Sequence, residues 1–122
     1  SRNGGLGEII NGPVNLAIDP ISNLDISTVW SEKVTAVKGN ECDTFWVISF
    51  AQGDFYSFKV DATGVDVSGV VVSSVNFSTT DKRGYLQVSP NGQYIAFADY
   101  RAGQQNINGS AQLFNFDNQN IE

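Results

Sequence analysis

The stretch TFWVISFAQGDFYSFKVD, residues 44–61, decides the fold class of this chain of 122 residues. Its two runs of aromatic and β-branched residues, Thr44–Phe50 and Phe55–Val60, favour extended strands over helix. Between them stands Gln52-Gly53-Asp54, a connection short enough to join antiparallel neighbours. The stretch therefore predicts a β-hairpin.

The second half of the chain repeats this pattern. Phe45–Phe50 aligns with Gln93–Ala98 at an offset of 48 residues, and Phe58–Asp61 aligns with Phe114–Asp117 at an offset of 56. The second copy thus holds eight additional residues, centred on Arg101–Ser110, and these predict an inserted loop. A recurring unit of about 40 to 50 residues with four strands is typical of β-propeller blades.

The remaining strands follow from similar runs bounded by turn residues such as Pro90-Asn91-Gly92. No stretch sustains the spacing of an amphipathic helix, so the predicted class is all-β: a β-propeller-like repeat of four-stranded antiparallel blades. We expect strands at Lys33–Lys38, Thr44–Phe50, Phe55–Val60, Ser68–Val75, Tyr85–Ser89, Tyr94–Asp99 and Ala111–Phe116.

These strands amount to about two and a half blades, whereas a propeller closes with about 4 to 8. We expect residues 1–32 to form part of a preceding blade and a connector, residues 33–85 the first full blade, and residues 86–122 a second, incomplete blade. The chain is accordingly interpreted as a fragment whose partners include the other blades of a larger chain.

Composition excludes several classes of function. A net charge of −6 with seven scattered Lys and Arg residues argues against nucleic-acid binding, which needs clustered basic side chains. The chain has no His, which removes catalytic triads built on imidazole. No apolar run reaches the length of a membrane span, so no membrane insertion is expected. Cys42 is the single cysteine and is expected to be free.

Three segments together resemble a known family: Glu32–Lys38, Phe45–Ile48 and Gly84–Gly92. Their order and spacing are similar to the N-terminal propeller regions of large, gliding-motility-associated bacterial surface proteins exported by the type IX secretion system. The start Asn3–Glu8 looks like the strand that precedes the first of these segments in that family. Gly39 departs from the pattern, because family members often carry a His there.

The resemblance implies a protein that is secreted or held on the outer surface of a bacterium. It further implies a role in adhesion or scaffolding, in which the propeller binds a surface glycan or a protein. With no His in the chain, we favour a non-catalytic binding module and expect no catalytic residues. The alternative is part of a metal-dependent, lactonase-like propeller hydrolase, in which Glu32 at the head of an inner strand is one metal ligand.

The expected ligand-binding residues are Tyr100 and Arg101, because they begin the inserted loop and loops carry variable contacts. Aromatic residues, Tyr85 among them, are also candidates for stacking on sugars. Trp46 and Tyr94 hold equivalent repeat positions, which favours packing between blades. We expect no cofactor and no metal. The frequent Asp residues make calcium an alternative, but no EF-hand spacing occurs and turns account for Asp61.

Overall fold

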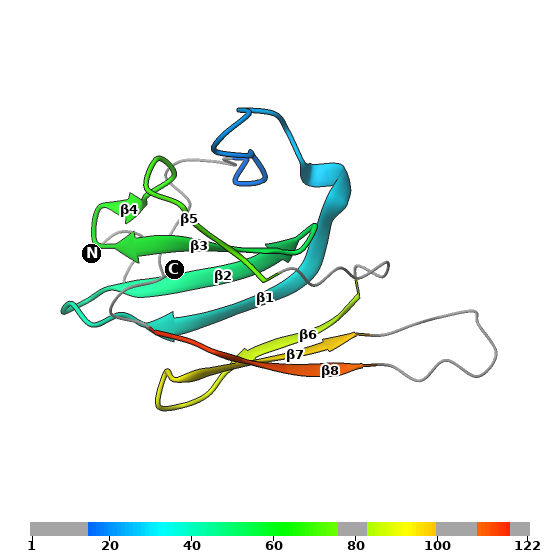
Figure 1. The fold of residues 1–122 in the computed structure, drawn as a ribbon. Helices are drawn as coiled ribbons and strands as arrows, with labels where there is room; N and C mark the ends of the chain where they lie inside the picture. The colour runs from blue at the N-terminus through cyan, green and yellow to red at the C-terminus, as the bar shows by residue number, and fades with distance from the viewer. Residues whose placement is uncertain (1–14, 76–82, 100–109, 118–122) are drawn as a thin grey trace, which may run out of the picture.

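The computed structural model describes residues 15–75, 83–99 and 110–117, and these residues form an all-β fold of two antiparallel sheets (Figure 1). The helical content of the described ranges is one short 3-10 turn, η2 (Ser27–Val29). The predicted all-β class is therefore confirmed. None of the described helical segments is long or apolar enough to cross a membrane.

The first sheet, called sheet 1, contains β1 (Trp30–Lys38), β2 (Phe45–Ala51) and β3 (Asp54–Asp61) in spatial order. The free side of β3 pairs with two short strands, β4 (Gly64–Val65) and β5 (Val71–Ser74). Gln52 and Gly53 connect β2 to β3 with φ angles of 50° and 88°. Positive φ at both central residues identifies a type I′ turn, whose twist matches the strands it joins. The predicted hairpin is confirmed.

The second sheet, sheet 2, has the order β6 (Gly84–Val88), β7 (Tyr94–Asp99) and β8 (Ala111–Asn115). The Ser89 hydroxyl accepts hydrogen bonds from the backbone N–H groups of Gln93 and Tyr94 and so closes the turn between β6 and β7. All seven predicted strands have counterparts in the two sheets. Sheet 2 begins at Gly84, slightly before the blade boundary expected at residue 86, and the division into blades stays a prediction.

Strand pairing follows the predicted repeat. Ser49 in β2 pairs with Tyr56 in β3. The repeat offset of 48 relates Ser49 to Phe97 in β7, and the offset of 56 relates Tyr56 to Gln112 in β8. Phe97 and Gln112 also pair with each other. Equal pairing at both offsets means that the two hairpins are equivalent in register as well as in sequence.

The main core lies between the two sheets, with β1 next to β6 (Figure 1). The rings of Phe50 and Phe97 meet across it edge to face, with their centroids 4.8 Å apart. A smaller cluster lies on the other face of sheet 1. It consists of Ala51, Tyr56 and Phe58, on which side chains such as Trp30 pack. The main core consists of Ile48, Phe50 and Phe55 from sheet 1 and Leu86, Val88, Ile95 and Phe97 from sheet 2.

The outer face of sheet 2 points away from this core and carries no charged residue on its described strands. Strand alternation and pairing place on it Tyr85, Gln87, Tyr94, Ala96, Ala98, Ala111, Leu113 and Asn115. Leu113 is 68% exposed and Tyr94 is 41% exposed. Trp46 packs against the core as expected, but its equivalent Tyr94 does not, because none of the described segments covers this face.

Candidate functional site

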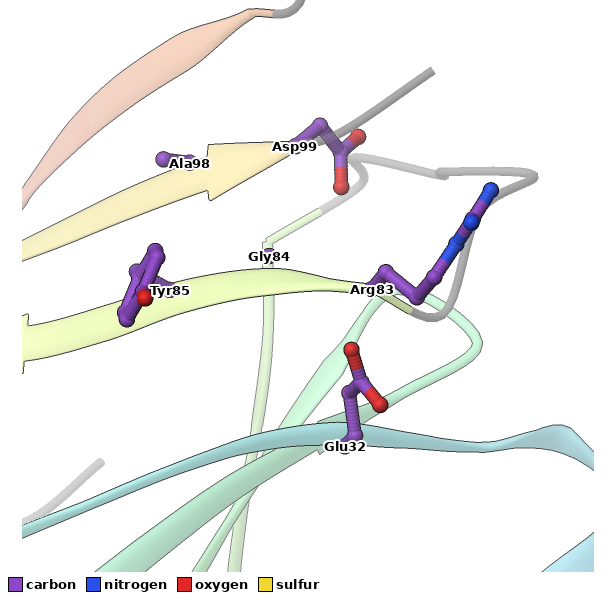
Figure 2. Close-up of a pocket in the computed structure, with 6 residues that line it drawn as sticks. All are labelled: Glu32, Arg83, Gly84, Tyr85, Ala98 and Asp99. Atoms are coloured by element: carbon purple, nitrogen blue, oxygen red, sulfur yellow. The ribbon is translucent and has the colours of Figure 1, made fainter. Parts of the chain in front are cut away.

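A cleft of about 610 Å³ opens where the two sheets meet. Its lining comes from the beginning of β1, the beginning of β6 and the end of β7, three segments that are distant in sequence. Figure 2 shows the carboxylates of Glu32 and Asp99 projecting from β1 and β7 toward the space between these strands. The residues that line the cleft are Glu32, Arg83, Gly84, Tyr85, Ala98 and Asp99.

Gly84 allows the strands to approach each other at the cleft. Its φ of +139° lies in a region that L side chains rarely adopt. A Cβ atom here would also collide with the carbonyl oxygen of Ala98 and come within 2.9 Å of Cε of Lys33. The position therefore requires glycine, both for its backbone conformation and for the space it leaves.

Beneath the cleft lies a buried ion pair that links the two sheets. Lys33 of β1 is 1% exposed, and its Nζ lies 3.0 Å from Oδ1 of Asp99 at the end of β7. The same ammonium donates a hydrogen bond of 2.9 Å to the carbonyl of Arg83 and lies 4.8 Å from the centroid of the Phe97 ring. The register of β1 shifts between Trp30 and Val34, around the position from which Lys33 enters the core.

The carboxylate of Asp99 is fully buried, and its charged partner is the ammonium group of Lys33. Both carboxylate oxygens are buried, and neither accepts a hydrogen bond within the described ranges. Lys33 compensates the charge of this buried carboxylate, which would be costly to bury unpaired. The side of the cleft nearest β7 is therefore backed by a buried ion pair whose charges compensate each other.

The rim of the cleft is exposed and balanced in charge. Glu32 contributes a carboxylate, Arg83 a guanidinium group, and Tyr85 an aromatic ring that is 83% exposed. Acceptor, donor and aromatic face thus surround one opening. This combination suits the binding of a small polar molecule that also offers an apolar surface.

The sequence located part of this site. Glu32, named for the alternative hydrolase function, lines the cleft. Tyr100 and Arg101, the expected ligand-binding residues, lie outside the described residues, although they directly follow Asp99. Asp99 itself was missed as a site residue. The sequence signal that could have identified it is a charged residue at the end of each of two apolar strands. These residues are Lys33 and Asp99, and both stand at positions that face the core.

In the described ranges, no group of three His, Cys, Asp or Glu side chains is arranged to hold a metal ion. Asp61, one of the carboxylates that suggest calcium, forms a local turn as expected. Its Oδ1 accepts a hydrogen bond of 2.8 Å from the backbone N–H of Thr63 and another from the Thr63 hydroxyl. Both bonds lower the pKa of Asp61 below its usual value, and the bond from the Thr63 hydroxyl has the larger effect.

No protein-family model, no curated protein and no solved structure matches this chain.

Proposed function

We propose that this chain is a non-catalytic binding module within a larger β-propeller and that the cleft between its two sheets is the binding site. The observation that carries the proposal is the cleft itself. It places Glu32, Arg83 and the exposed ring of Tyr85 around an opening above the buried ion pair of Lys33 and Asp99. An opening that combines charged groups with an exposed aromatic ring suits a polar ligand that also offers an apolar surface.

The stacking of the sheets supports a propeller. Each sheet runs as a meander from its first strand, and these first strands, β1 and β6, lie side by side. Ile48 and Phe50 of sheet 1 are covered by sheet 2, and their repeat equivalents are Ala96 and Ala98 on the open outer face. In the proposed propeller, a further blade packs on the part of that face that carries Ala96, as sheet 2 packs on sheet 1, and leaves the cleft at the end of the strands open.

The resemblance of Glu32–Lys38 and Gly84–Gly92 to type IX-secreted surface proteins supports a setting for this module. In that setting the protein is secreted or lies on the outer surface of a bacterium. Its role is adhesion or scaffolding, and its ligand is a surface glycan or a surface protein.

The binding proposal is tested with polysaccharide and protein fractions from bacterial cell surfaces, immobilised for surface plasmon resonance. We expect the chain to bind one fraction and release it unchanged, and we expect Tyr85→Ala to weaken binding at least fivefold. Tyr94→Ala is the matched control, because Tyr94 lies on the same outer face of sheet 2 near the opposite end of the strands. Hydrolysis of the bound fraction would contradict a non-catalytic module, and equal binding by both variants would move the site away from the cleft.

A metal-dependent hydrolase is the second candidate, because the cleft brings Glu32 and Asp99 to one opening. Since the described residues hold no group of three suitable ligands, this function takes further ligands from other parts of the protein. It predicts a stoichiometric divalent ion in the protein isolated from its source, and Glu32→Gln would abolish both metal content and turnover. A metal-free protein that still binds its ligand would exclude it.

A further inference from the structure

Strand β8 forms an edge of sheet 2, whereas its repeat equivalent, β3, pairs with other strands on both sides (Figure 1). β3 pairs with β2 on one side and with β4 and β5 on the other. Among the described strands, β8 pairs with β7 alone. Burial reflects the difference, because Ser57 in β3 is 2% exposed and its equivalent Leu113 in β8 is 68% exposed. The repeat therefore indicates where a further strand fits.

The backbone hydrogen bonds at the two ends of β8 show which of its residues face this edge. Before the strand, the N–H of Asp99 donates to the carbonyl of Ser110 at 2.8 Å. After it, the N–H of Phe116 donates to the carbonyl of Gln93 at 2.7 Å. Hydrogen-bonded residues alternate along an antiparallel pair, so the even-numbered residues of β8 bond to β7. The N–H and C=O groups of its odd-numbered residues therefore point away from β7.

The paired edge of β3 shows the same alternation one repeat earlier. Ser57, the equivalent of Leu113, pairs with Val71 of β5. At the end of this ladder, the N–H of Val75 donates to the carbonyl of Gly53 at 3.1 Å. Ser57 lies four residues beyond Gly53, so by the same alternation its backbone groups face β5. The backbone groups of Leu113 are thus oriented to bond an incoming antiparallel strand.

The described edge of β8 also lacks the usual features that prevent strand addition. Its sequence, AQLFN, contains neither a charged residue nor Pro, and its pairing with β7 is continuous from Ala111 to Asn115. The edge strand of sheet 1, β1, differs because it carries Glu32 and Lys38. Its pairing with β2 is also interrupted by a shift of register. A regular, uncharged edge favours pairing with a further strand.

We propose that the edge of β8 binds an extended, uncharged peptide strand by strand addition, as β5 covers β3. The repeat offset of 56 places the equivalents of Val71–Ser74 beyond Glu122, so the strand comes from outside these 122 residues. It runs antiparallel to β8, and the residue opposite Leu113 corresponds to Val71. β5 consists of Val and Ser, and such β-branched and small polar side chains suit the uncharged outer face of sheet 2.

This inference goes beyond the proposed function. It rests on the repeat and on the edge of sheet 2 opposite β6, whereas the proposed function rests on the cleft beside β6. The two sites are therefore tested separately.

The experiment measures, by fluorescence anisotropy, the binding of a fluorescein-labelled peptide with the sequence GVVVSSV of residues 69–75. We expect saturable binding that Leu113→Pro weakens about tenfold or more. Pro removes the N–H that faces the incoming strand and removes no hydrogen bond to β7. Leu113→Ala keeps this N–H and is the matched control, with a change of about threefold or less. Thermal unfolding of both variants verifies that the fold is intact.

Methylated peptides test the register without any change to the protein. Methylation of the backbone nitrogen at the position of Val71 or of Ser73 removes a donor that faces β8, so it should weaken binding about tenfold. The N–H at the position of Val72 points away from β8, and methylation there should change binding by about threefold or less. Equal effects at all three positions would contradict the register.

Three further outcomes would overturn the proposal. If the peptide does not bind, β8 does not accept a strand of this chemistry. Binding that Leu113→Pro leaves unchanged would mean that the peptide occupies another edge, such as that of β3 in place of β5. A dimer of the chain that Leu113→Pro dissociates would make a second copy the occupant. None of these results alters the test of the cleft, which uses surface fractions and Tyr85→Ala.

Discussion

Strands β2 and β7 occupy equivalent positions in the repeat, but β2 is buried on both faces and β7 mainly on one. In β2, Ile48 is 0% exposed and Phe50 is 1% exposed, because sheet 2 covers them. Their equivalents in β7, Ala96 and Ala98, lie on the outer face of sheet 2. Strand β7 instead buries Ile95 and Phe97, which correspond to Val47 and Ser49 in β2.

The difference shows that strand formation is local, whereas burial depends on the neighbouring sheet. Both strands alternate and pair in the same register. Sheet 2 therefore has one face that behaves as a core and one that behaves as a surface in this chain. Substitutions on the covered face and on the open face measure how differently the two faces contribute to the free energy of unfolding.

The largest expected effect comes from Phe50→Ala. Phe50 packs edge to face on Phe55 and Phe97, at centroid distances of 5.1 and 4.8 Å, so truncation leaves a cavity between the sheets. We expect the free energy of unfolding to fall by about 3–5 kcal/mol in urea titrations. Tyr94→Ala, on the open face, should change it by about 0.5 kcal/mol or less. Comparable losses would mean that the outer face is covered.

Lys33→Met tests the polar link between the sheets. The substitution leaves the buried carboxylate of Asp99 without its charged partner, so we expect a loss of about 3 kcal/mol. The double variant Lys33→Met with Asp99→Leu should recover most of this loss, because no unpaired charge stays buried. Urea titrations of the two single variants and the double variant form a complete cycle. Losses that simply add would contradict a direct interaction between the two side chains.

Gly84→Ala should destabilise the protein by about 2–3 kcal/mol, since it adds a steric clash to backbone strain. The matched substitution is Gly64→Ala in β4. Gly64 has a φ of +120° but nothing within 4 Å of a Cβ, so only strain of about 1–2 kcal/mol applies there. Thermal unfolding of both variants checks the difference, and equal losses would show that the space at the cleft is not limiting.

The smallest effect concerns acid stability at the turn after β3. Hydrogen bonds from Thr63 lower the pKa of Asp61 in the folded protein, so the unfolded chain binds the proton more readily. This contribution is complete above the pKa of the unfolded state, about 3.9, and is lost as the pH falls through the lower folded value. Asp61→Asn should therefore lose less stability than the wild type between pH 5 and pH 3 in urea titrations. An equal loss of stability in Asp61→Asn and in the wild type over this range would contradict the contribution of Asp61.

Much of the fold was predictable because its determinants are local. Alternating apolar runs and short turns identified the strands, and the comparison of the two halves identified equivalent hairpins. The two-residue strand β4 was missed, because Gly64 and Val65 are too few to form a pattern and pair only through the position of β3. The bend that turns Lys33 into the core likewise has no signature in the local sequence.

The site was predictable only in part. Glu32 attracted attention because it stands at the head of a strand, and Tyr85 because it is aromatic. Arg83, Gly84 and Asp99 carry no motif by themselves. Their significance comes from the approach of β1 to β6 and β7, which brings together residues that are 50 positions apart, as Lys33 and Arg83 are, or more, as Lys33 and Asp99 are.

The sequence by itself determined the all-β class, the hairpin turns and the repeat, because backbone preference and side-chain alternation act over a few residues. Tertiary structure alone decided which face of each sheet is covered, that Lys33 and Asp99 form an ion pair, and that a cleft opens above them. The physical reason is that burial and electrostatic pairing depend on which segments meet in space. Two strands with the same pattern therefore came to have different surroundings.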